Sequence, residues 1–204
     1  MNVSKKYKFI YWSTPACASR AVCAFLQGIG SDMWNFDMDY NLEDRNKTCT
    51  HTVGIPKEYK NYPIIAAARN PYSRIVAAYN DVSFENPDMT FDQFISEVQG
   101  DDGCYTSTWM EHQLPSFIIR LEHMEEDLNR LDFIKDKVSN ELWEESLNTS
   151  VRHNHYKGER PKDSYDEKGL QITKTKYTQE QADKVYKIYE NSFKVVGYKR
   201  DSWK

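Results

Sequence analysis

The chain has 204 residues, 39% of them hydrophobic, and a formal net charge of -4 at pH 7. This is enough for one domain with a sizeable core and short for two, so we expect a single domain over residues 1–204. The acidic balance argues against a nucleic-acid partner, which needs an excess of basic charge. The charge is uneven, because segment 1–31 holds basic residues and no acid, and we expect an anion to be drawn there. The basic residues are Lys5, Lys6, Lys8 and Arg20.

The apolar runs and the cysteines further limit the class of protein. No stretch approaches the roughly 20 apolar residues of a membrane span. The run after the first lysines is too short for a secretory signal. We therefore expect a cytoplasmic protein without a membrane partner. The 4 cysteines show no C-x-x-C pairing, which favours reduced thiols over a disulfide scaffold, and we expect no metal site.

The first element along the chain is a strand at 8–12 (KFIYW), because the run is short, aromatic and β-branched. A small-residue loop follows at 14–19 (TPACAS), and 20–27 then has helical character. Such a loop lets backbone N–H groups approach a phosphate or sulfate, although the same residues are also common as plain connections. The polar segment 31–62 is interpreted as loops with one short helix.

The segment after residue 63 is the best indication of function. The apolar run 64–68 (IIAAA) predicts a buried strand, and RNPYSRIVAAY follows directly, from Arg69 to Tyr79. This order predicts a strand, an arginine-bearing turn and a helix, which is how α/β proteins place a phosphate at the carboxyl end of a sheet.

The rest of the chain continues the alternation. Thr90 is a plausible N-cap for a helix at 91–98, and Phe117-Ile118-Ile119 predicts a strand followed by a charged helix at about 124–138. The aperiodic, basic segment 146–175 is interpreted as a long functional loop. Thr178 and Gln181 form a capping-box pattern ahead of an amphipathic helix that ends near Gly197.

Strands that alternate with helices predict an α/β fold with a parallel sheet and right-handed crossovers. Ligands of such sheets bind at the carboxyl ends of the strands. The loop at 14–19 and the turn at 69–74 should both lie there. We therefore expect two anion-binding elements to face one crevice.

These motifs resemble those of sulfotransferases that use 3′-phosphoadenosine 5′-phosphosulfate (PAPS), in the style of the carbohydrate and cytosolic enzymes. The resemblance implies a three-layer, P-loop-like α/β fold with a central parallel sheet flanked by helices. The segment IIAAARNPYSRIVAAYND is similar to the family's strand, R-[ND]-P turn and helix. By that resemblance Arg69 holds the 3′-phosphate, with Ser73 and Arg74 as second choices. Ala77 stands where the family usually has a serine.

The first loop resembles the family's 5′-phosphosulfate loop, which implies that its residues contact the donor: Pro15, Ala16, Cys17, Ala18, Ser19 and Arg20. Ala16 stands where the family usually has its catalytic lysine, which stabilises charge on the leaving oxygen. Arg20 or a lysine from elsewhere, such as Lys157, is a candidate for that charge. Ser19 matches the family's phosphate-contacting hydroxyl.

Two further segments resemble the family. His51, within THTVGIP, matches the histidine that acts as general base, and imidazole suits that role because its unperturbed pKa lies near neutrality. The segment 151–157 resembles the loop that covers the donor, which makes Asn154 and Lys157 candidate contacts. Glu122 is expected to be a fold contact rather than a base.

The resemblance implies in-line transfer of a sulfuryl group from PAPS to a hydroxyl or amine acceptor, which includes carbohydrate, with 3′,5′-adenosine bisphosphate (PAP) as product. Two alternatives remain: a member that binds the nucleotide without turnover, and another nucleotide-dependent transferase. The chain lacks G-x-x-x-x-G-K-[ST], which disfavours a magnesium-dependent ATPase. The lack of an anchor favours a bacterial or viral origin, and acceptor and oligomeric state stay open.

Overall fold

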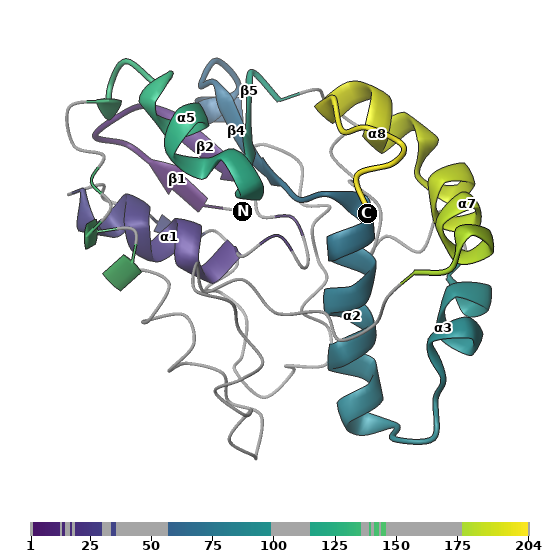
Figure 1. Ribbon diagram of the computed structural model, residues 1–204. Coiled ribbons are helices and arrows are strands. Elements are labelled where there is room, and N and C mark those ends of the chain that lie inside the picture. The colour runs from purple at the N-terminus through teal and green to yellow at the C-terminus, as the bar shows by residue number, and fades with distance from the viewer. Residues whose placement is uncertain are drawn as a thin grey trace. The chain divides into compact units, whose positions relative to one another are not determined.

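The computed structural model describes residues 2–12, 14, 17, 19–29, 34–35, 57–98, 115–135, 139, 141–142, 144–145 and 177–203 (Figure 1). The chain divides into two compact units. One comprises Met1–Ala68 and Ser107–His153, and the other comprises Arg69–Thr106 and Asn154–Lys204. Each unit has its own buried core. That the whole chain is a single domain stays a prediction.

The first unit is built on a five-stranded sheet in the order β3-β1-β2-β4-β5. Three of its strands are parallel, with Ile10 opposite Ile64 and Ala66 opposite Ile118. The expected α/β fold with parallel strands is therefore confirmed. The strands are β1 (Asn2–Ser4), β2 (Phe9–Trp12), β3 (Trp34–Asn35), β4 (Ile64–Ala68) and β5 (Phe117–Arg120).

The sheet also has an antiparallel part that we did not predict. Strand β1 is antiparallel to both β2 and β3, which makes the sheet mixed. Strands of three and two residues are too short for an alternating pattern to be recognised, so sequence periodicity gives no signal for them.

Helices flank this sheet, and Figure 1 shows α5 and α1 above and below the strands. The helix expected at 20–27 is α1 (Ser19–Gly28). Short 3-10 turns, η3 (Lys57–Tyr59) and η4 (Leu121–His123), precede β4 and α5 (Met124–Asn129). The helix expected to extend to 138 was too long. The amides of Arg130 and Leu131 donate to carbonyls three residues back, which tightens and ends the last turn.

The first unit's core lies on the parallel strands. Every residue of β2 and β4 is buried, as expected for parallel strands that are covered on both faces. The Phe9 ring stacks on that of Phe133, with centroids 5.1 Å apart, which seals the segment after α5 onto the sheet.

The second unit is helical: α2 (Pro71–Glu85), α3 (Phe91–Glu97), α7 (Gln179–Ile188) and α8 (Glu190–Val196). Thr90 and Thr178 each form the capping box with the glutamine three residues later, so both predicted helix starts are confirmed. Gly197 ends α8 in the left-handed conformation, with a φ of 84°. The single helix expected before it was wrong, because the backbone breaks at Tyr189 while the apolar spacing continues through the break.

Buried apolar side chains of the four helices and the residues next to them form the second unit's core. The aromatic residues of α3, Phe91 and Phe94, are core side chains. The buried members are Tyr72, Ile75, Val76, Ala78, Phe91, Phe94, Ile95, Val98, Ala182, Val185, Tyr189 and Phe193. The long loop expected at 146–175 lies outside the described residues. Within the described part of the chain, every helix falls short of the length and apolar character that a membrane span requires.

The turn between β1 and β2 contains a strained residue. Lys8 has a φ of 56°, which a side chain with a Cβ adopts at a cost of about 1 kcal/mol. Lys8→Gly is therefore expected to raise the free energy of unfolding by about 0.5 kcal/mol, because relief of strain exceeds the added unfolded-state entropy. Urea denaturation measures it, with Lys6→Gly in the same turn as the control that should destabilise. Equal losses in both variants would contradict the prediction.

Candidate functional site

The carboxyl ends of β2 and β4 are neighbours, because the strands are parallel and Trp12 is opposite Ala66. After β2 the chain makes a tight turn, in which the Cys17 amide donates to the Thr14 carbonyl at 3.3 Å. Both residues are buried, and α1 begins two residues later at Ser19. This strand, turn and helix order confirms the connection predicted between 12 and 20. Pro15, Ala16 and Ala18 lie outside the described residues, as do the side chains of Ser19 and Arg20.

After β4 the chain enters the arginine-bearing turn. Arg69 follows the last strand residue directly and is 8% exposed. Asn70 is the N-cap of α2, since its side chain accepts a hydrogen bond from the Tyr72 amide at 3.0 Å. Pro71 occupies the first helical turn, where its missing N–H costs nothing. The R-N-P sequence therefore fixes the point at which strand becomes helix.

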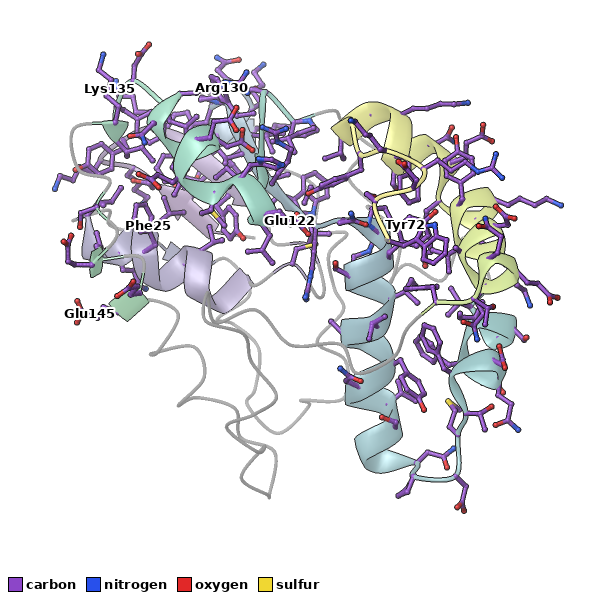
Figure 2. All side chains as sticks on the ribbon, in the orientation of Figure 1. Phe25, Tyr72, Glu122, Arg130, Lys135 and Glu145 are labelled. Carbon is purple, nitrogen blue, oxygen red and sulfur yellow. The ribbon has the colours of Figure 1, made fainter. Side chains whose placement is uncertain are left out.

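The start of α2 is also fixed by the C-terminal segment of the same unit. The Asn70 side-chain amide donates to the Ser202 hydroxyl at 2.8 Å, and the Tyr72 hydroxyl donates to the Arg200 carbonyl at 2.7 Å. Burial raises the pKa of Tyr72 to about 12. Tyr72, labelled in Figure 2, is therefore a neutral anchor and not a proton acceptor near neutral pH.

Ser73 and Arg74, the second choices for contact with the 3′-phosphate, differ in their surroundings. Ser73 is half-buried in the first turn of α2. Arg74 is 2% exposed, and its guanidinium carbon lies 4.9 Å from the centroid of the Tyr189 ring. Arg74 thus packs into the second unit at the point where α7 gives way to α8. Their contact with a phosphate stays a prediction.

The carboxyl end of β5 carries an ion pair that the sequence analysis missed. Asp127 accepts hydrogen bonds from the Arg120 amide, Nε and Nη2, each at 2.8 Å, and its side chain is 1% exposed. Burial by itself would raise the pKa of Asp127, but the hydrogen bonds and charge of Arg120 outweigh it and lower that pKa. The pair locks the end of β5 to α5. An arginine that ends a strand seven residues before an acid was its only sequence signal.

Three of the basic residues near the N-terminus lie away from the loop at 14–19. Lys5, Lys6 and Lys8 lie in the turn before β2, at the amino end of the parallel strands, whereas the loop after Trp12 leaves from the carboxyl end. The length of β2, about 13 Å at 3.3 Å per residue, separates the two ends. The three lysines therefore lie at the opposite end of β2 from that loop, and the expectation that an anion is drawn to segment 1–31 stays a prediction.

Other predicted site residues lie outside the described part of the chain. These are His51, Asn154 and Lys157. Glu122 is half-buried in η4 (Figure 2). Its interpretation as a fold contact stays a prediction.

The arrangement defines a class of protein. Two strand-turn-helix segments begin on the adjacent parallel strands β2 and β4 and leave the sheet from the same edge. The second segment has an arginine at its turn. This is how α/β proteins that bind phosphorylated ligands are organised. The model of the sulfotransferase family matches residues 1–199, so it spans both units, and the chain belongs to the sulfotransferase family. It is thus assigned to the transferases that move sulfuryl groups. No curated protein and no solved structure matched the chain.

Proposed function

We propose that this protein transfers a sulfuryl group from PAPS to a hydroxyl or amine acceptor. The main support for this proposal is the turn at Arg69, in a chain that the sulfotransferase family model covers over residues 1–199. An arginine held between a buried strand and a capped helix is a pre-organised phosphate ligand, because its guanidinium offers a planar fork of donors.

The residues present fit the donor's charges. PAPS carries a 3′-phosphate and a 5′-phosphosulfate, so it needs two separate anion-binding elements. Arg69 supplies a guanidinium immediately after β4, and the start of α1 supplies backbone N–H groups that have no acceptor within the helix. Since β2 and β4 are adjacent and parallel, both elements leave the sheet from one edge.

The proposed mechanism assigns one task to each residue. The bound donor supplies an activated sulfuryl group with PAP as its leaving group. Arg69 binds the 3′-phosphate, and Ser19 with the loop at 15–20 orients the phosphosulfate. His51 takes the proton from the acceptor, which suits a side chain whose unperturbed pKa is near 6.5. Positioning and electrostatics then do most of the work, as in phosphoryl transfer.

A second candidate is a protein that binds PAPS or PAP without turnover. Ala16 favours it, because a methyl group cannot stabilise charge on the leaving oxygen as lysine would. In the active case Arg20 or Lys157 supplies that charge. A different nucleotide-dependent transferase is the third reading, and a requirement for magnesium and ATP would support it.

The Ala16→Lys variant separates the first two candidates. In the active case, transfer of sulfur-35 from labelled PAPS should be measurable in the wild type and unchanged or lower in Ala16→Lys, since another cation already fills the role. Ala18→Lys serves as the control for a new charge in the same loop. If the wild type is inactive and Ala16→Lys alone creates turnover, by about 100-fold over background, the natural chain is the binding protein.

The acceptor class is proposed as a small molecule or carbohydrate with a free hydroxyl or amine. A panel of neutral sugars, amino sugars and phenols, tested with labelled PAPS, would identify it. A phenol-only preference would remove carbohydrate from the proposal.

A further inference from the structure

The lysines at the amino end of the sheet have no part in the proposed transfer. Together with η3 and the residue after it, they form a cluster of exposed lysines, here called the basic edge. Glu58 is the one acid within the described segments 2–12 and 57–63. The basic edge consists of Lys5, Lys6, Lys8, Lys57 and Lys60.

Contacts within the first unit bring the two segments of the basic edge together. The Lys5 ammonium lies 6.0 Å from the centroid of the Tyr59 ring, which joins the β1–β2 turn to η3. The Ile10 amide donates to the Pro63 carbonyl at 2.9 Å, which ties the start of β2 to the residue before β4. The basic edge is thus one surface on a rigid sheet and not two separate charged loops.

An exposed aromatic side chain lies at the same edge. Phe117, the first residue of β5, is 40% exposed and is paired with Ile65 on the neighbouring strand. Through Ile65, Phe117 is level with Tyr11, two residues beyond the start of β2, and with adjacent strands about 4.8 Å apart it lies about 10 Å across the sheet from Tyr11. Phe117 is one of two large apolar side chains exposed among the described residues, the other being Val195.

We propose that the basic edge docks this protein on an anionic membrane surface. A cluster of lysines attracts acidic lipid headgroups without needing bidentate geometry, whereas specific recognition of sulfate or phosphate groups on a soluble chain favours arginine. Every basic residue of the basic edge is a lysine. Phe117 adds the apolar contact that electrostatic attraction needs for stable peripheral binding. The expectation of no membrane partner rested on the lack of a spanning segment, which peripheral binding does not require.

Docking at this edge would leave the donor side of the sheet open. The parallel strands point their carboxyl ends away from the basic edge, so the proposed donor elements face away from the lipid. Because the whole chain has a net charge of -4, acidic residues outnumber basic ones outside the basic edge. The charge distribution therefore favours the orientation in which the basic edge faces the membrane.

Vesicle co-sedimentation tests the proposal with the full-length protein. One set of vesicles contains phosphatidylcholine only, and the other adds roughly 30% phosphatidylserine. We expect binding to the acidic set only, weakened by salt as the Debye length shortens. Lys57→Gln/Lys60→Gln should weaken that binding about 30-fold, at about 5-fold per lysine. Phe117→Ser should also weaken it.

Lys187→Gln/Lys199→Gln is the matched control, since it removes two exposed lysines from the second unit and should leave binding unchanged. Thermal melting checks that every variant is folded. Equal binding to both kinds of vesicle, equal loss in the two double variants, or binding of soluble poly-uridylate without vesicle binding would each overturn the proposal. Vesicle binding is measured without PAPS, so its outcome is independent of the proposed transfer.

Discussion

Replacing Arg69 with alanine is expected to abolish the preference of this protein for PAP over AMP. The two nucleotides differ at the 3′-phosphate, so the difference between their affinities reports on the group that contacts it. Loss of a guanidinium that makes charge-assisted hydrogen bonds to a phosphate should lower PAP affinity about 100-fold. Binding of AMP should change little.

Titration calorimetry with both nucleotides measures the effect. Arg130→Ala is a matched control, because it removes the same charge from a side chain that is 70% exposed. Arg69→Lys should recover only part of the affinity, since lysine cannot offer the planar fork. A parallel fall in PAP and AMP affinity in Arg69→Ala would show that Arg69 supports the fold and does not read the 3′-phosphate.

The second large effect is on stability. Asp127→Ala is expected to lower the free energy of unfolding by about 3 kcal/mol, because it leaves Arg120 without its buried partner at the end of β5. Asp132→Ala removes an acid that is 98% exposed and should change stability by less than about 0.5 kcal/mol. Urea denaturation compares the two variants, and equal losses would contradict the assigned role of the pair.

The Asp127 carboxylate should also make the free energy of unfolding fall as the pH is lowered. Hydrogen bonds from Arg120 lower the pKa of Asp127 in the folded protein. The unfolded chain therefore binds the proton first as pH falls, and stability contributed by the pair is complete above about pH 5 and lost progressively below it. The gap between wild type and Asp127→Ala should accordingly narrow from pH 7 to pH 3. A gap that is constant over this range would mean that Asp127 is not ionised in the fold.

Local sequence signals predicted the elements that present the site. The strand at 64–68 and the start of α2 follow from an apolar run and an N-cap followed by proline, which act over a few residues. The capping boxes at Thr90 and Thr178 each join residues three positions apart. Such patterns can be read without knowledge of the tertiary structure.

Contacts made over longer separations could not be predicted. The hydrogen bonds of Asn70 with Ser202, and of Tyr72 with the Arg200 carbonyl, join positions more than 100 residues apart and leave no periodic signal. The side of the sheet on which Lys5 and its neighbours lie depends on the direction of the short strand β1. Strand direction is set by tertiary pairing, so composition alone does not show at which end of the sheet these lysines lie.

The central claim is that PAPS is the donor, and the most direct test is the order of nucleotide affinities in the wild-type protein. Titration calorimetry with PAP, ADP and AMP should show PAP binding at least about tenfold more tightly than the other two, because only PAP carries the 3′-phosphate. Binding of none of the three by a folded protein would contradict the account. The proposed donor site would then be wrong, although the fold and family would stand.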